Sequence, residues 1–182
     1  EGPHTSHFSI VDAAGNRVAA TLSINLPFGS GFMAEGTGVL LNDEMDDFAA
    51  STTASNAYGL IGSEANRVAP GKRPLSSMSP TFVESPRGVL VLGTPGGSRI
   101  ITMVALGILG WSQGFDVGTI VSLPRLHHQY LPDEIQFEPG ALSDAQQKDL
   151  QKRGHTLKPL TSMYGNMQAV SWMPKGDSLQ AA

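Results

Sequence analysis

The sequence predicts an α+β fold in which a mostly antiparallel sheet carries helices on one face. Strand patterns open the chain, helix patterns fill its middle, and strand patterns close it. The chain has 182 residues, of which 40% are hydrophobic and 15% charged. This composition is that of an ordinary globular protein, and the length favours one domain with one substantial core.

The first predicted element is a β-hairpin. β-branched and apolar residues dominate both of its arms, residues 5–12 and 17–26, and residues 13–16 supply the turn. From residue 27 to 72, small and polar residues interrupt every periodic pattern except 38–41 and a short helical turn at 43–48. So long a connection is usually functional or held by a partner.

A second hairpin, with arms 81–83 and 89–92, leads into the helical part of the chain. We expect Ser98 to cap a helix over 99–112, and a second short helix over 116–123 to stop at Pro124. Both are rich in apolar residues, as helices that lie on a sheet should be.

The last third of the chain combines one helix with four strands. Ser143 and Gln146 form a capping box for a helix that ends at Arg153, before Gly154. Strands are predicted over residues 134–138, 156–160, 167–173 and 178–181, with a turn at 174–177. Because the last strand stops abruptly, we expect that the natural chain continues.

Charge and composition argue against several classes of function. The formal net charge of −4, with scattered Lys and Arg, provides no cationic surface for nucleic acid or an anionic membrane. The absence of cysteine excludes disulfides and thiolate chemistry. The longest apolar run, residues 100–111, is too short to span a bilayer. If the protein is exported, its signal must lie on another segment of a longer precursor.

Four short segments carry residues suited to chemistry. Three are turns rich in glycine or hydroxyl groups, and the fourth holds four carboxylates in five positions; they are residues 5–7, 73–79, 94–98 and 42–48. Each alone is most simply a turn, a cap or a solvated acidic face.

Together and in this order, these segments resemble the small subunit of the γ-glutamyltranspeptidases, which are N-terminal nucleophile hydrolases. The matching stretches are residues 5–12, 42–48, 71–80, 96–102 and 124–129, and the resemblance runs from Thr5 to the last residue. It implies an αββα sandwich of which this chain supplies roughly half. A large subunit from the same precursor would complete it as a heterodimer.

The resemblance also implies catalytic residues. Thr5 would be the nucleophile, and its α-amine, once freed by precursor cleavage, the general base. Ser23 would hydrogen-bond to Thr5 and orient it. Gly96 and Gly97 match the oxyanion hole, where backbone N–H groups meet the charge that develops on the carbonyl oxygen.

The substrate contacts implied by the resemblance surround a zwitterionic glutamyl group. Asn25, Glu44 and Asp47 match positions that hold its α-ammonium. The hydroxyls of Ser76 and Ser77 match donors to its α-carboxylate, together with an arginine that the family's large subunit supplies.

A lid residue completes these implied contacts. Tyr58, in the loop over residues 51–67, matches a lid tyrosine that reaches toward Asn25 over the bound glutamyl group.

The activity implied is γ-glutamyl transfer and hydrolysis on glutathione and related compounds, without metal or cofactor. Such enzymes are usually periplasmic, secreted or on the cell surface. Glu1–His4 would be residual precursor residues, and residues 5–182 the small subunit, cut from the precursor before Thr5. Two alternatives stay open: a glutaryl or cephalosporin acylase of the same family, and a non-catalytic subunit kept for assembly.

Other interpretations of single features are weaker. His127 and His128 are neighbours on a predicted strand, so their side chains point to opposite faces and cannot share one metal ion. The acidic segment lacks the ligand spacing and central glycine of an EF-hand calcium loop. We expect His7 to be structural.

Overall fold

The computed structural model describes residues 4–51, 54–176 and 178–182. The elements within these residues are, in chain order, β1 (Thr5–Val11), β2 (Arg17–Ser23), β3 (Met33–Ala34), β4 (Val39–Leu40), η1 (Glu44–Asp47), η2 (Glu64–Asn66), β5 (Thr81–Ser85), β6 (Gly88–Gly93), η3 (Gly97–Arg99), α1 (Ile100–Ser112), α2 (Val117–Ser122), β7 (Leu126–His127), β8 (Ile135–Phe137), α3 (Asp144–Lys152), β9 (Leu157–Pro159), β10 (Gln168–Met173), η4 (Pro174–Gly176) and β11 (Ser178–Ala181), where η marks a 3-10 helix.

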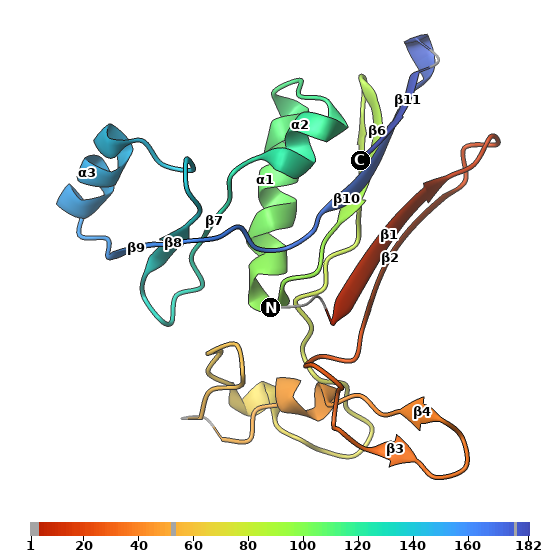
Figure 1. Ribbon diagram of the computed structural model, residues 1–182, viewed down its shortest axis with the longest axis vertical. Coiled ribbons are helices and arrows are strands. Elements are labelled where there is room, and N and C mark those ends of the chain that lie inside the picture. Colours follow the sequence, from red (N-terminus) through yellow and green to blue (C-terminus); the bar gives the residue numbers. More distant parts are fainter. Residues whose placement is uncertain (1–3, 52–53, 177) are drawn as a thin grey trace.

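The central sheet has the strand order β11-β10-β6-β5, and every neighbouring pair is antiparallel. Helices α1 and α2 cover one face of this sheet, and the β1–β2 hairpin lies along the other (Figure 1). Strand β6 is therefore buried over its whole length, which explains its unbroken run of apolar residues. The predicted sheet with helices on one face is confirmed.

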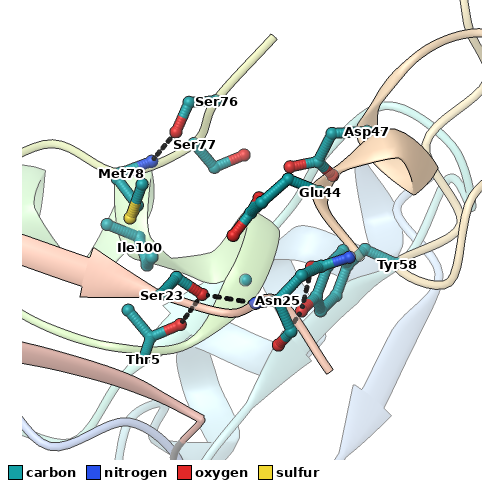
Figure 2. Close-up of a pocket in the computed structure, with 11 residues that line it drawn as sticks. Thr5, Ser23, Asn25, Glu44, Asp47, Tyr58, Ser76, Ser77, Met78 and Ile100 are labelled. Carbon is teal, nitrogen blue, oxygen red and sulfur yellow. Dashed lines mark hydrogen bonds between the residues drawn. The ribbon is translucent and has the colours of Figure 1, made fainter. Parts of the chain in front are cut away.

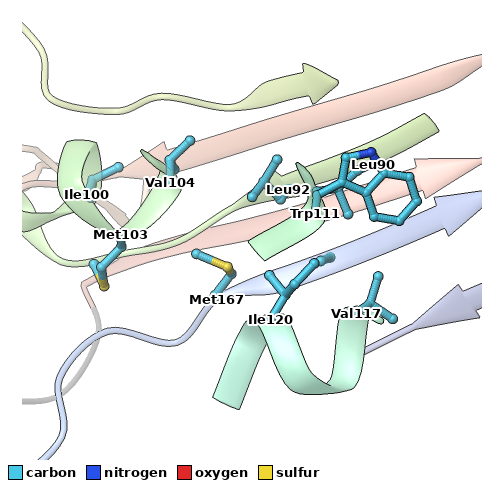
Figure 3. Close-up of a cluster of buried hydrophobic side chains, with 10 residues drawn as sticks. Leu90, Leu92, Ile100, Met103, Val104, Trp111, Val117, Ile120 and Met167 are labelled. Atoms are coloured by element: carbon cyan, nitrogen blue, oxygen red, sulfur yellow. The ribbon is translucent and has the colours of Figure 1, made fainter. Parts of the chain in front are cut away.

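The core fills the space between the sheet and the two helices (Figure 3). Leu90 and Leu92 of β6 point toward the helices and have no exposed surface, and Met103 of α1 is equally buried. Burying each such side chain contributes about 1.5–3 kcal/mol. Gly107 lets α1 approach the sheet, because a Cβ there would lie 2.6 Å from Leu92 Cδ1.

The hairpin contacts the other face of the sheet through one side only. His7 of β1 packs against Gly93, where a Cβ would lie 2.3 Å from the imidazole ring, so only glycine fits at this position. The opposite side of the hairpin carries Phe8, Ile10 and Leu22, which are 43%, 47% and 62% exposed. The chain thus forms a hairpin layer, a sheet layer and a helix layer.

Two smaller regions flank these layers. Residues 24–80 contain β3, β4, η1 and η2 and lie below the end of the hairpin in Figure 1. On the other side of α1, β7, β8 and β9 form a small sheet in which β8 and β9 are parallel. A buried ion pair between Arg125 and Glu138 supports this sheet, and Glu138 also accepts a hydrogen bond from the Tyr164 backbone N–H.

Most predicted elements are present, with boundary differences that have local causes. The capping box of Ser143 and Gln146 is confirmed at the start of α3. The hairpin's second arm ends at Ser23 rather than at residue 26, because Asn25 takes a left-handed conformation with φ of 69°. Strand β3 was not predicted.

The prediction that Ser98 caps α1 is wrong. The residue before α1 is Arg99, which makes no capping bond through its side chain, and Ser98 lies inside the 3-10 turn η3. Its hydroxyl donates instead to Gln129 Oε1 at 2.6 Å. Gly96 and Gly97 have positive φ and fold the chain into η3 before the helix begins, so Ser98 never takes the extended conformation of a cap.

Within the described residues, no helix combines the length and the hydropathy that crossing a membrane requires.

Candidate active site

A pocket opens where the hairpin, the start of α1 and the region over residues 24–80 meet (Figure 2). It brings together residues far apart in the sequence. Its lining consists of Thr5, Ser23, Asn25, Glu44, Asp47, Tyr58, Ser76, Ser77, Met78, Gly97 and Ile100.

Thr5 and Ser23 face each other at the end of the hairpin. They are paired in the antiparallel register, as the first residue of β1 and the last of β2. Their hydroxyl oxygens are 2.9 Å apart, and Thr5 is 8% exposed. Residues directly opposite on one face of such a ladder are close, so the hairpin itself sets this distance. The Thr5 nitrogen is a peptide amide here, because His4 precedes it.

Asn25 connects the hydroxyl pair to Tyr58. Its backbone N–H donates to Ser23 Oγ at 2.8 Å, and its side-chain Oδ1 accepts from the Tyr58 hydroxyl at 3.0 Å. Burial raises the pKa of the Tyr58 hydroxyl. The negative charges of nearby carboxylates, of which Asp47 has the largest effect, raise this pKa further. The tyrosine therefore stays protonated and remains a donor at neutral pH.

Glu44 and Asp47 lie on η1, whose single turn places both on the pocket side (Figure 2). Burial raises the pKa of the Asp47 carboxyl to about 6, and the negative charge of Glu44 adds to this effect. Two neighbouring carboxylates in a half-buried pocket are mutually repelling, and a bound cation would relieve that repulsion.

The turn from β6 into α1 forms another wall. Gly96 has φ of 144° and Gly97 φ of 58°. The Tyr58 ring lies directly on Gly97, since a Cβ there would be 2.4 Å from a ring carbon. The hydroxyl of buried Thr94 donates to the Pro95 carbonyl at 2.8 Å. In a trans peptide the C=O and N–H point in opposite directions, so this bond fixes the orientation of the Gly96 N–H.

Ser76 and Ser77 approach from the chain before β5. Ser76 Oγ accepts the backbone N–H of Met78 at 3.2 Å. In Figure 2 the Ser77 hydroxyl and the Glu44 carboxylate point into the same space.

Each histidine named in the sequence analysis has hydrogen-bond partners. The ring nitrogens of His7 lie 2.8 Å from Thr21 Oγ1 and 2.9 Å from Ser9 Oγ. His127 contacts Thr102 and Gln129, and His128 contacts Asp133. In the part of the chain that the structure describes, no three His, Cys, Asp or Glu residues gather as metal ligands would.

Comparison with known proteins identifies the family. A family model described as γ-glutamyltranspeptidase matches residues 1–182. The chain belongs to the γ-glutamyltranspeptidase family. It is 51% identical over 156 residues to the glutathione hydrolase proenzyme of Pseudomonas sp. (strain A14), a match that covers 85% of this chain and 27% of that protein. For the glutathione hydrolase proenzyme of Escherichia coli (strain K12), the identity is 44% over 179 residues. This match covers 97% of this chain and 30% of that protein.

The solved structures confirm the fold. An acivicin-inhibited γ-glutamyltranspeptidase aligns with a TM-score of 0.88 at 40% identity, covering 97% of this chain and 94% of that chain. The fold is that of the N-terminal nucleophile hydrolases, of which this chain supplies part. The chain spans less than a third of the length of the two γ-glutamyltranspeptidase relatives named above, 27% and 30%.

The pocket contains nine of the ten residues that the family resemblance singled out. The tenth, Gly96, is not in the lining and lies one residue before Gly97 in the same turn. Sequence reasoning missed Met78 and Ile100, which line the pocket, and Gln129, which contacts Tyr58. All three lie in or beside the matching stretches, but those stretches gave no sign of which apolar or amide side chains reach the pocket.

Proposed function

We propose that this chain is the catalytic small subunit of a γ-glutamyltransferase and glutathione hydrolase, with Thr5 as its nucleophile. One observation carries the proposal: the Thr5–Ser23 hydroxyl pair, the Gly97 turn and the carboxylates of Glu44 and Asp47 surround one pocket.

In the proposed reaction, Thr5 Oγ1 attacks the γ-carbonyl carbon of a γ-glutamyl compound and loses its proton to the general base. The C–N bond then breaks, the leaving amine takes that proton, and a γ-glutamyl ester remains on Thr5. Water or an acceptor amine attacks the ester and regenerates the hydroxyl. The N–H groups of Gly96 and Gly97 would donate to the oxyanion.

Charge complementarity supports a zwitterionic donor. The carboxylates of Glu44 and Asp47, with Asn25, would hold the α-ammonium, which relieves the repulsion that raises the pKa of Asp47. The hydroxyls of Ser76 and Ser77 would donate to the α-carboxylate. A glutaryl donor has no ammonium, so the acylase alternative would leave two carboxylates unpaired in the pocket.

Maturation would begin at the same residue. Thr5 Oγ1 attacks the His4 carbonyl carbon, the peptide C–N bond breaks, and the acyl group moves from nitrogen to oxygen. Breaking of that C–N bond frees the Thr5 α-amine, which titrates near neutrality and would then act as general base. Hydrolysis of the ester restores the Thr5 hydroxyl and releases the upstream chain with a carboxylate at His4. The acivicin-inhibited relative is described as having a C-terminus with critical roles in autoprocessing and catalysis.

A large subunit from the same precursor would cover the exposed apolar surface. The outer side of the hairpin presents Phe8, Ile10 and Leu22, and the region around β3 and β4 presents Phe28 and Phe32, which are 76% and 63% exposed. Apolar surface of this extent usually marks an interface. By family resemblance we also propose that the enzyme works in the periplasm, as a secreted protein or at the cell surface.

The test is to express the full precursor and compare wild type with Thr5→Ala. We expect wild type to yield two chains, the smaller starting at Thr5, and to release aniline from a γ-glutamyl anilide. Thr5→Ala should remain one chain without activity, whereas Thr161→Ala, at an exposed position outside the pocket lining, should match wild type. An active mature chain that still begins at Glu1, or a preference for a glutaryl anilide, would contradict the proposal.

A further inference from the structure

Gln129 ends the 124–129 stretch, to which the proposed reaction gives no role, yet it makes the contacts that join the lid loop to the turn before α1. Its side-chain Nε2 donates to the Tyr58 carbonyl at 2.9 Å and to the Leu131 carbonyl at 3.0 Å. Its Oε1 accepts from the Ser98 hydroxyl at 2.6 Å and lies 2.7 Å from His127 Nε2.

These four contacts define the orientation of the amide. Carbonyl oxygens only accept hydrogen bonds, so the amide nitrogen must face Tyr58 and Leu131. The oxygen then faces Ser98 and His127, which makes His127 Nε2 a donor. Both donors and both acceptor positions of the amide are used, so a rotation of the side chain would break all four bonds.

Tyr58 is consequently held at both ends. Its hydroxyl donates to Asn25 beside the nucleophile pair (Figure 2). Its ring rests on Gly97, and its backbone carbonyl accepts a hydrogen bond from Gln129. The same glutamine also accepts a hydrogen bond from Ser98, the residue that follows Gly97. The lid and the oxyanion turn are therefore tied to one side chain outside the pocket lining.

We propose that Gln129 is a positioning residue that latches the lid loop over the glutamyl site and keeps Tyr58 in register with the turn at Gly97. The inference rests on the proposed function for its kinetic consequence. The latch itself is a structural claim that can be measured separately.

The decisive variant is Gln129→Glu. The carboxylate has the same shape and still accepts from Ser98 and His127, but it has no N–H groups for the two carbonyls, so the lid side of the latch is lost while the other side stays. A less populated closed lid weakens apparent substrate binding in proportion. We expect KM for a γ-glutamyl anilide to rise roughly tenfold, as for the loss of one or two buried hydrogen bonds, with kcat within about twofold of wild type.

Limited proteolysis measures how often the lid loop opens and does not depend on catalytic turnover. Chymotrypsin can cut after Tyr58 and Leu60, and this cleavage should be roughly tenfold faster in Gln129→Glu if opening of the lid limits it. Ser98→Ala removes one of the two hydrogen bonds that Gln129 Oε1 accepts, and this variant should give intermediate values in both assays. Gln151→Glu makes the same chemical change at an exposed position of α3 and should match wild type in both.

The outcomes separate the two proposals. A wild-type precursor that processes but cannot hydrolyse the anilide defeats the proposed function, while the cleavage comparison still reports on the latch. The latch is overturned if Gln129→Glu matches wild type in cleavage rate, if faster cleavage leaves KM unchanged, or if cleavage is equally faster after Trp111 in α1, which would mean general destabilisation.

Discussion

The two sides of the pocket are held in place by different interactions. Thr5 and Ser23 are fixed by a regular antiparallel ladder, and Gly97 by the turn between the buried strand β6 and α1. Glu44 and Asp47 instead belong to a region of short turns, held by individual polar bonds such as Asn66 Nδ2 to the Asp47 carbonyl at 2.7 Å.

Under the proposed function, this difference separates the residues that carry out the reaction from those that bind the substrate. The ladder and the core cannot shift without breaking many bonds, so the reactive geometry is set before substrate arrives. The turn region can change one contact at a time. Substitutions on the ladder and turn side should therefore affect mainly kcat, and those on the acidic side mainly KM.

The largest expected effect is that of Gly97→Ala. Its φ of 58° strains an alanine, and the added Cβ would meet the Tyr58 ring at 2.4 Å, so both the turn at Gly97 and the loop that carries Tyr58 must move. We expect kcat to fall on the order of 100- to 1,000-fold, as when an oxyanion donor is lost. Gly154→Ala is the matched control, since φ there is 93° and nothing lies within 4 Å. Equal activity of Gly97→Ala and wild type would contradict the expectation that the ladder and turn side controls kcat.

Substitutions on the acidic side of the pocket should change mainly KM. Asp47→Asn removes a charge that would face the ammonium in the proposed function. We expect KM to rise about 10- to 100-fold with kcat nearly unchanged, because a hydrogen bond to a charged group amounts to about 1.5–3 kcal/mol. Since the pKa of Asp47 is about 6, wild-type KM should also rise as pH falls through that value, and the variant should lose this inflection. Initial rates from pH 5 to 8 measure both.

The same variant should be more stable than wild type at pH 7. The folded-state pKa of Asp47 lies above its ordinary value of 3.8, so the folded protein binds the proton more tightly than the unfolded chain. The group's contribution to stability is complete below about pH 4 and is lost as pH rises through about 6. Removing the charge should raise the free energy of unfolding at pH 7 by about 1 kcal/mol or less, after solvent screening. Thermal unfolding of both proteins without substrate measures this, and a less stable variant would contradict the raised pKa.

The smallest effect on activity is expected for Ser143→Ala. Ser143 caps α3 and reaches neither side of the pocket. We expect a loss of about 1 kcal/mol in the free energy of unfolding. Both kcat and KM should stay at wild-type values, and a change in either would mean that α3 is coupled to the site.

Local patterns predicted the regular elements well because their causes are local. The strand preference of the β-branched and apolar residues along 5–12 and the capping box at Ser143 depend on neighbours a few positions away, and the strand and the capping box are both present in the structure. Ser98 does not cap α1, and the partner that its hydroxyl has instead, Gln129, is 31 positions away. The candidate site came from the family resemblance, and no local pattern would have placed Glu44 beside Thr5.

The sequence by itself determined the order of most strands and helices, the hairpin over residues 5–26, and the motifs that identify the family. Only the tertiary structure decided that Met78 and Ile100 line the pocket, that Tyr58 rests on Gly97, and that Gln129 donates to the Tyr58 carbonyl. The physical reason is the separation along the sequence of the residues that interact. Secondary structure arises from residues a few positions apart, whereas a pocket arises where distant segments are brought together by packing, and no single segment carries that information.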